Sequence, residues 1–169
     1  MEHPALVAYL LEHGADPNTQ SNTGQTPLSF AIARAPRSVV ELLLGAKADV
    51  AKGDPLHCAV VRQTDDCASL IHLLIQLGAS PNTHQWEDPA ASYMRYDLPH
   101  QTPLHKACYR GNREAVEVLL AHGADPAAPT LQYGKEVPPT PLDVARKKGD
   151  AEIISWLEDR LHEKSSKDN

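Results

Sequence analysis

The apolar residues of this chain gather in short segments of Leu, Val, Ile and Ala, and polar segments rich in Gly, Pro, Asp and Asn separate them. Apolar positions that recur on one side of a helical period are typical of amphipathic helices. The pattern predicts one helix over 3–13 and then four helix pairs. The predicted pairs are 27–34 with 37–44, 55–62 with 68–77, 103–110 with 113–121, and 141–148 with 151–162.

Two short motifs recur along the chain in alternation. The first contains Thr or Asp, then Pro and Leu, and ends in Ala; its copies are Thr26–Ala31, Asp54–Ala59, Thr102–Ala107 and Thr140–Ala145. The second closes an apolar segment and continues into a polar turn, in most copies through Gly-Ala; its copies are Leu10–Asn18, Leu43–Val50, Leu74–Asn82 and Leu119–Pro126. Internal self-similarity of this kind is the signature of repeat proteins.

Each motif position has a structural role. Thr is a good helix N-cap because its hydroxyl accepts a backbone hydrogen bond, and Pro suits the first helical position. The small Ala lets two helices approach closely, and the Leu pair supplies the core between repeats. Gly ends the second helix through a left-handed cap. The motifs therefore predict helix–turn–helix units stacked side by side.

The two motifs together resemble the ankyrin repeat over most of the chain. The resemblance implies an all-α fold, a solenoid of stacked helix–turn–helix units from which β-turn loops, here called fingers, project to one side. It also implies that His57 and His105 bond to neighbouring backbone. We expect a single domain over 1–163 with a polar tail over 164–169. The domain divides into a partial repeat over 1–22 and repeats over 23–52, 53–98, 99–136 and 137–163.

The repeats are irregular in length. The four copies of the first motif start 28, 48 and 38 residues apart, whereas the family period is about 33 residues. The spacing predicts a truncated finger at 50–53, an expanded finger at 83–101 and a longer, Pro-rich connector at 127–139. The segment 3–14 corresponds to an outer helix without an inner partner, so we expect the chain to be the C-terminal part of a longer array, or a trimmed one.

Composition restricts the class of protein. Lys and Arg number 16 against 22 Asp and Glu, and the net charge is −6. Because nucleic-acid binding needs a basic face, we expect no nucleic-acid partner. No apolar run approaches the ~20 residues that span a bilayer, so we expect no membrane contact. Three cysteines are too few for a disulfide framework, which indicates an intracellular protein, cytoplasmic or nuclear.

Cations occupy the same register near the end of every predicted inner helix. They are Arg34, Arg62, Arg110 and Lys148, and Lys106 and Lys147 lie beside them in the sequence. Stacking of the repeats should align these residues as a basic column. Either the cations are present because the C-terminus of a helix favours positive charge, or the column receives an acidic peptide segment of a partner.

The expanded finger is rich in aromatic residues. It contains Trp86, Tyr93 and Tyr96, and Tyr109 follows on the next predicted inner helix. Aromatic side chains are enriched at the hot spots of protein interfaces. Either these rings fold back and cover the stack, or the finger is a recognition loop that is ordered in part by its partner.

No motif for catalysis or cofactor binding is present in the sequence. The nine His residues lack the Cys/His spacing of metal sites, and there is no phosphate-binding or nucleophile motif. We therefore predict a non-catalytic protein–protein interaction module without metal or cofactor, which binds a protein or peptide across its concave groove and long finger. The alternatives are a structural spacer within a larger protein and an accessory domain of an enzyme encoded elsewhere in a longer chain.

Overall fold

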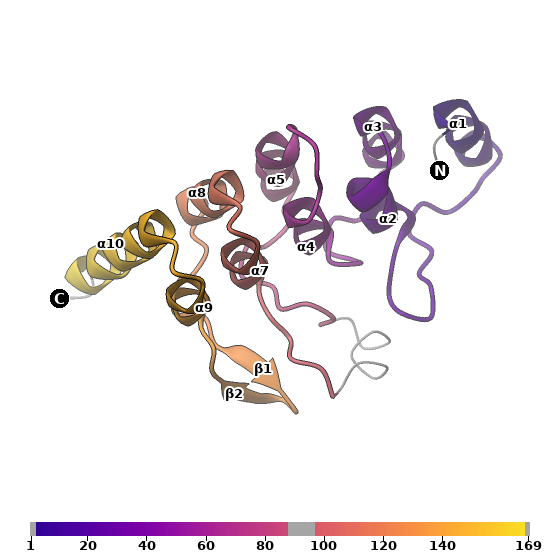
Figure 1. Ribbon diagram of the computed structural model, residues 1–169. Coiled ribbons are helices and arrows are strands. Elements are labelled where there is room, and N and C mark those ends of the chain that lie inside the picture. Colours follow the sequence, from indigo (N-terminus) through magenta and orange to yellow (C-terminus); the bar gives the residue numbers. More distant parts are fainter. Residues whose placement is uncertain (1–2, 88–96, 168–169) are drawn as a thin grey trace.

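The computed structural model describes residues 3–87 and 97–167, and their helices form two rows (Figure 1). The outer row consists of α1 (Pro4–Glu12), α3 (Arg37–Gly45), α5 (Cys67–Gln76), α8 (Arg113–Ala121) and α10 (Ala151–Lys167). The inner row consists of α2 (Pro27–Arg34), α4 (Pro55–Val60), α7 (Pro103–Arg110) and α9 (Pro141–Lys148). Each inner helix packs against the outer helix that follows it and against its neighbours in the inner row. The all-α solenoid is therefore confirmed.

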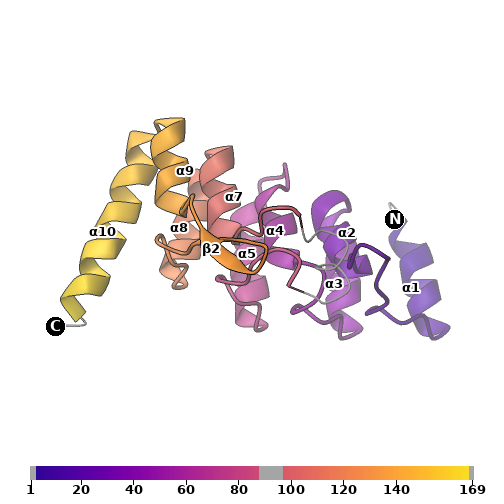
Figure 2. The same ribbon diagram turned by 90° about the horizontal axis from the view of Figure 1, so that it is seen from below.

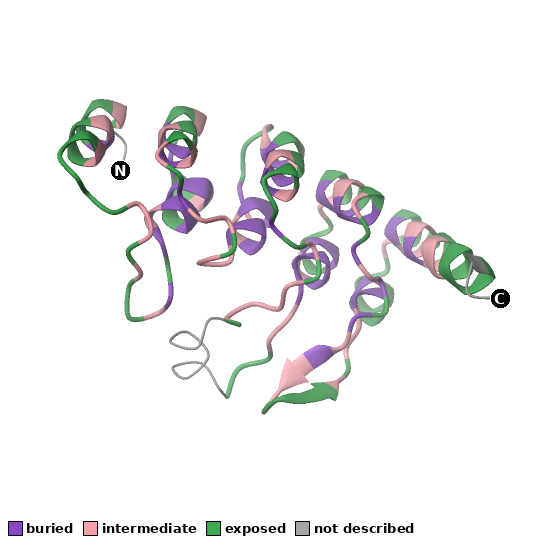
Figure 3. Cartoon of the chain, turned by 180° about the vertical axis from the view of Figure 1, so that it is seen from behind, coloured by how far each residue is buried: buried purple, intermediate pink, exposed green. Residues whose placement is uncertain are grey.

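The core lies between the two rows, where Figure 3 shows the buried positions on the facing sides of the helices. Leu28, Leu70, Leu104 and Leu157 are fully buried there. The Ala that closes each copy of the first motif is also fully buried; these residues are Ala31, Ala59, Ala107 and Ala145. A methyl group at these positions lets the two rows pack closely, as the motif predicts.

The N-caps of the inner helices follow the motif except in α4. In α2 the Thr26 hydroxyl accepts a hydrogen bond from the Ser29 N–H at 3.1 Å. The matching Asp54 has a left-handed backbone (φ +58°) and does not cap α4. Its carboxylate instead accepts hydrogen bonds from the Trp86 N–H at 3.0 and 3.2 Å. The uncapped α4 ends at Val60, two residues before the end of the predicted helix at 62.

The segment 127–139 is not only a connector, because it contains a β-hairpin. Strand β1 (Thr130–Gln132) pairs antiparallel with β2 (Lys135–Val137), and Figure 2 shows β2 in front of the helices when the molecule is seen from below. The turn residues Tyr133 and Gly134 both have positive φ, +52° and +69°. Two such residues form the hairpin turn whose twist matches that of the flanking strands.

Helix α10 is longer than the predicted 151–162, because it continues to Lys167 through most of the predicted tail. The added turn carries an ion pair between Arg160 and Glu163 at 3.1 Å. Lys164 also reaches Asp125 of the preceding finger at 3.0 Å. Among the helices in the described part of the chain, none has the length and apolar character needed to cross a bilayer.

Asparagine side chains join successive fingers. The Asn18 side chain donates to the Lys47 carbonyl at 3.4 Å and accepts from the Asp49 N–H at 2.7 Å. Asn82 makes the same pair of hydrogen bonds one repeat later, donating to Gly123 at 3.0 Å and accepting from Asp125 at 2.8 Å. The fingers are therefore held in register by polar side chains as well as by the apolar core.

Candidate functional site

The exposed side chains of the inner row form the candidate site. We define the inner-helix surface by the residues Phe30, Arg34, Lys106, Tyr109, Arg110, Lys147 and Lys148. Phe30 is 39% exposed and Tyr109 is 61% exposed. Lys106 is half-buried, and the remaining cations are exposed. Five of the six cations that the sequence singles out thus lie on the inner helices α2, α7 and α9, and Tyr109 lies on α7 with two of them.

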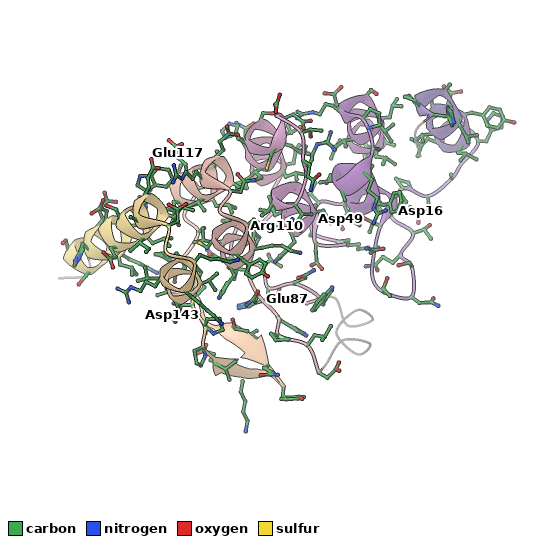
Figure 4. The ribbon with its side chains drawn as sticks, in the orientation of Figure 1. Asp16, Asp49, Glu87, Arg110, Glu117 and Asp143 are labelled. Atoms are coloured by element: carbon green, nitrogen blue, oxygen red, sulfur yellow. The ribbon has the colours of Figure 1, made fainter. Side chains whose placement is uncertain are left out.

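Cations on the two rows differ in their partners. Those of the outer row are neutralised locally, in the pairs Arg37–Glu41, Arg113–Glu152, Arg160–Glu163 and Lys164–Asp125, all within 3.2 Å. On the inner row, Arg146 of α9 pairs with Glu158 of α10 at 2.8 Å. Four others, Arg34, Arg110, Lys147 and Lys148, form no ion pair with any carboxylate of the described residues. Figure 4 shows the two sides, with Arg110 on α7 and Glu117 on α8.

Acidic residues are scarce on the inner row. The inner helices contain one, Asp143 on α9. Its carboxylate accepts hydrogen bonds from the Thr140 N–H and hydroxyl, both at 2.9 Å, and these bonds lower the pKa of Asp143. The inner-helix surface is therefore positive on a chain whose net charge is −6.

Two aromatic rings on this surface lie beside cations. The Lys148 ammonium lies 4.1 Å from the centre of the Tyr109 ring, so that side chains of α9 and α7 meet on the open face. On α2 the Arg34 guanidinium lies 5.6 Å from the centre of the Phe30 ring. A cation over a ring face is an attractive arrangement. The exposed Phe30 was not singled out from the sequence, although it stands beside the motif Ala31 as Lys106 stands beside Ala107.

Arg62 departs from the expected column and must be removed from it. Its side chain is only 5% exposed, and it donates to the carbonyls of Ile32 at 2.7 Å and Ala35 at 2.9 Å. It also forms a two-point contact with Asp66 at 2.7 and 3.1 Å, and this contact lowers the pKa of the Asp66 carboxyl. Arg62 is committed to the fold.

The backbone at the end of α2 explains why Arg62 is buried. The inner helices α7 and α9 end in Gly111 and Gly149, whose left-handed backbones close the helix. Ala35 takes their place after α2 and is extended, with φ −100° and ψ 161°. An end without the left-handed cap leaves carbonyls open, and the Arg62 guanidinium fills two of them. Arg62 thus bonds the C-terminal end of the preceding inner helix, α2, and not that of its own helix, α4.

Lys106 lies in the middle of the inner-helix surface and is partly withdrawn from solvent. Burial lowers the pKa of its ammonium group, while the nearby Cys58 and Asp54 act in the opposite direction.

The three cysteines form no disulfide. Burial also raises the pKa of Cys58 to about 11, so this thiol is an inert part of the packing at neutral pH.

The ends of the long finger are held against the neighbouring repeats. Trp86 is half-buried, and its ring meets His100 edge-on with centroids 5.7 Å apart. The Gln85 N–H donates to the Gln101 carbonyl at 2.9 Å. His100 and Leu131 exchange backbone hydrogen bonds of 2.7 and 2.9 Å, which attach the finger to the hairpin. Tyr93 and Tyr96 lie outside the described residues.

Buried histidines connect the inner helices to the fingers, as the resemblance implies. The ring Nε2 of His57 bonds to the Gln101 carbonyl at 2.8 Å, and that of His105 bonds to the Pro139 carbonyl at 2.9 Å. Burial lowers the pKa of His57 to about 3 and that of His105 to about 4. Both rings are therefore neutral donors at physiological pH, and their role is structural.

A cavity of about 220 Å³ lies between the truncated finger and the start of the long finger. Its lining includes Val50, Asp54, Leu56 and Thr83. Its volume suits a single side chain rather than a cofactor, since small-molecule pockets measure about 300–1,000 Å³. Among the described residues, no group of three or more His, Cys, Asp or Glu side chains is arranged to hold a metal ion.

Comparison with known proteins finds several whose sequences are similar to that of this chain. The transient receptor potential channel pyrexia of Drosophila melanogaster is 34% identical over 130 residues, which are 73% of this chain and 12% of that protein. The transient receptor potential cation channel subfamily A member 1 of Homo sapiens is 26% identical over 160 residues, 90% of this chain and 13% of that protein. The ANK repeat-containing protein nipk-1 of Caenorhabditis elegans is 29% identical over 160 residues, 94% of this chain and 21% of that protein. The chain spans less than a quarter of each of these relatives.

The family comparison agrees with the fold. The family of ankyrin repeats (three copies) matches residues 1–85, 52–130 and 70–168, which together reach from end to end of the described structure. The stacked helix pairs, the Thr-Pro caps and the histidine bonds to the fingers are found in the same segments. This chain belongs to the ankyrin-repeat family.

Proposed function

We propose that this chain is a non-catalytic interaction module that binds an acidic segment of a partner protein on the inner-helix surface. Ankyrin repeats generally mediate protein–protein interaction. The observation that supports the finer proposal is the contrast between the two rows. Exposed cations on the outer row, and Arg146 on α9, already have carboxylate partners, whereas Arg34, Arg110, Lys147 and Lys148 of the inner row have none among the described residues. Unpaired like charges on a protein surface favour a partner of the opposite sign.

The region of α7 and α9 is the expected centre of the contact. Tyr109 supplies an exposed ring, and Lys148 lies on its face. Carboxylates of a partner can pair with Arg110 and Lys147 beside it. Arginine and aromatic residues carry much of the binding energy at protein interfaces. Lys106 and the Phe30–Arg34 pair extend the same surface toward α2.

We propose that the long finger borders this contact. Trp86 is fixed at the start of the finger by Asp54 and His100, and the finger is joined to the hairpin by the His100–Leu131 bridge. The proposal includes Tyr93 and Tyr96 as further contacts on the finger. Rings supported by a fixed stem cost less entropy on binding than rings on a free loop.

A structural spacer within a larger protein is the second candidate. Leu6 and Leu10 on α1 are 55% and 47% exposed and line an apolar pocket of about 250 Å³. The relatives are also several times longer than the matched segment. An accessory domain of an enzyme has no such observation in its favour.

The test compares two charge reversals of equal size. The site variant is Arg110→Glu with Lys148→Glu, and the matched control is Lys47→Glu with Lys135→Glu. Lys47 and Lys135 are also exposed and without an ion pair among the described residues, but Lys47 follows the outer helix α3 and Lys135 lies on β2 of the hairpin. Each protein, first shown to be folded by circular dichroism, is titrated with a fluorescent decapeptide rich in Glu and used as bait with mass spectrometry of captured proteins.

We expect the site variant to bind the peptide at least tenfold more weakly than the wild type, and the control to bind like the wild type after allowance for net charge. The single substitution Tyr109→Ala in the wild type should also weaken binding, although it leaves the net charge unchanged. Equal losses in both charge variants would show a general charge effect and would refute the site. If all baits capture the same proteins, the inner-helix surface is not the binding site, and the long finger is the site to test next.

A further inference from the structure

We propose that His72 and His122 form a two-histidine binding site for a divalent transition ion such as Zn²⁺ on the outer row. The two residues are 50 positions apart in the sequence, and the stack brings them together. His72 Nδ1 lies 2.7 Å from His122 Nε2, and the ring centroids are 4.8 Å apart. His72 is exposed and His122 is half-exposed, so the shared edge of the two rings is open to an ion from solvent.

The positions of the two nitrogens suit a shared ion. Zn–N bonds of 2.0–2.1 Å place two nitrogens of a tetrahedral ion roughly 3.3 Å apart. The observed 2.7 Å is the length of a hydrogen bond between the rings. The rings therefore need to separate by roughly 0.6 Å, which small side-chain rotations provide. The ion takes the place of the single proton between the nitrogens, that proton passes through solvent to Nδ1 of His122 so that both rings stay neutral, and water completes the coordination.

The backbone on both sides of the pair is fixed. His72 lies inside α5, and α5 packs against α8. His122 caps the C-terminus of α8, where its N–H bonds to the carbonyls of Val118 and Leu119. The next residue, Gly123, is held by the Asn82 side chain. A site built on rigid elements loses little freedom when it binds its ligand.

Gln76 supports one of the ligands. Its amide nitrogen lies 2.8 Å from His72 Nε2, the ring nitrogen on the other side from His122. An amide can present either its NH₂ group or its oxygen. A half-turn of the amide exchanges its nitrogen and oxygen, so that the oxygen accepts from an Nε2–H and the lone pair of His72 is on Nδ1, facing His122. Histidine ligands of metals are oriented in this way by a hydrogen bond to the second nitrogen.

The test is a Zn²⁺ titration by calorimetry on protein without a polyhistidine tag. His3→Asn is present in every sample, because a histidine next to the free amino terminus can bind metal ions by itself. The site variants are His72→Asn and His122→Asn, and the matched control is His162→Asn, an exposed histidine on α10. Folding is checked by circular dichroism, and urea midpoints are measured with and without Zn²⁺.

We expect one Zn²⁺ per chain with a dissociation constant below about 0.1 mM, and at least a tenfold loss of affinity in either site variant. The control should bind like its parent. Zn²⁺ should raise the urea midpoint of the parent but not that of a protein carrying both site substitutions, since the ion links α5 to α8. No saturable binding by the parent, or an equal loss in the His162→Asn control, would overturn the proposal.

Discussion

Replacement of Arg62 by Ala is expected to destabilise this protein far more than replacement of any exposed cation of the inner row. The guanidinium makes two charge-assisted hydrogen bonds to the end of α2 and a two-point contact with Asp66. A hydrogen bond from a charged group contributes about 1.5–3 kcal/mol. Removal of the two bonds to Ile32 and Ala35 leaves buried carbonyls unpaired, so we expect a loss of about 3–5 kcal/mol.

The matched control is Arg110→Ala. Arg110 occupies the same register on α7, but it is exposed, and Gly111 closes its helix. A surface substitution of this kind changes stability by about 0.5 kcal/mol or less. Arg62→Met keeps the aliphatic stem and separates lost packing from lost hydrogen bonding. Urea unfolding followed by circular dichroism measures all three variants. A loss below about 1 kcal/mol for Arg62→Ala, similar to that of Arg110→Ala, would refute the reasoning.

The Arg62–Asp66 contact also predicts a pH dependence. The hydrogen bonds from Arg62 are the largest cause of the lowered pKa of Asp66 in the folded protein. In the unfolded chain this carboxyl titrates near its usual pKa of about 3.9. The stabilisation is therefore complete above that value and is lost as the pH falls through the lower pKa of the folded state. The difference in stability between wild type and Asp66→Asn should shrink over that acidic range, and a constant difference would contradict the assignment.

Three further predictions concern stability. A Cβ added at Gly45 in α3 meets no atom within 4 Å, and Lys47 has φ +64° where the other copies of the motif have Gly. The double substitution Gly45→Ala with Lys47→Gly should therefore stabilise the protein by about 1–2 kcal/mol. An unchanged urea midpoint would speak against this prediction. Asn82→Ala removes both links to the next finger and should cost about 1 kcal/mol, and Asn82→Asp, which keeps the bond accepted from the Asp125 N–H, should lose less; equal costs would show that this acceptor bond contributes nothing. His57 and His105 have lowered pKa values of about 3 and about 4, so near pH 6.5 the unfolded chain binds protons that the folded chain does not. Stability should be complete above that pH and fall steadily toward pH 4, less steeply in His57→Gln, and a flat urea-midpoint profile would rule out the assignment.

The local motifs predicted the rows and most helix ends. Thr26 and Thr140 cap their helices because capping depends only on residues three positions apart. The inner helices 27–34, 103–110 and 141–148 end as predicted, since Gly closes the last two and Ala35, which precedes Pro36, leaves the helical conformation after Arg34. The end of α10 was less predictable, because neither Gly nor Pro stops it and its last turn gains a contact with Asp125.

The hairpin was not predicted, although the sequence contains a signal for its turn. Two prolines on each side of 130–137 suggested a stiff connector. Within it, Tyr133 and Gly134 stand between two short segments with β-forming residues, and a two-residue loop ending in Gly favours a hairpin turn. Pairing with His100 depends on the neighbouring finger, so this part of the structure follows from tertiary contacts.

The sequence predicted which residues belong to the candidate site, but not the burial and the contacts of each of them. Sequence register placed Arg62 with Arg110, although Ala rather than Gly at position 35 leaves open the carbonyls at the end of α2 that Arg62 bonds. The meeting of Tyr109 with Lys148 depends on the spacing of α7 and α9, which the sequence does not state. The approach of His72 to His122 is of the same kind, because neither residue belongs to a recognisable ligand motif.

The asparagine links between fingers and the histidine links from inner helices to fingers imply that this chain can be shortened without losing its positive face. In the described residues, no side-chain hydrogen bond joins residues more than 52 positions apart, so each link reaches a neighbouring repeat at most. In such linear stacks the free energy is close to a sum over units and their shared interfaces. Deletion of the segment before α2 therefore removes one interface and leaves α7 and α9 as they are. The minimal fragment that carries Arg110 and Lys148 is the right object for transplanting this surface onto another repeat protein.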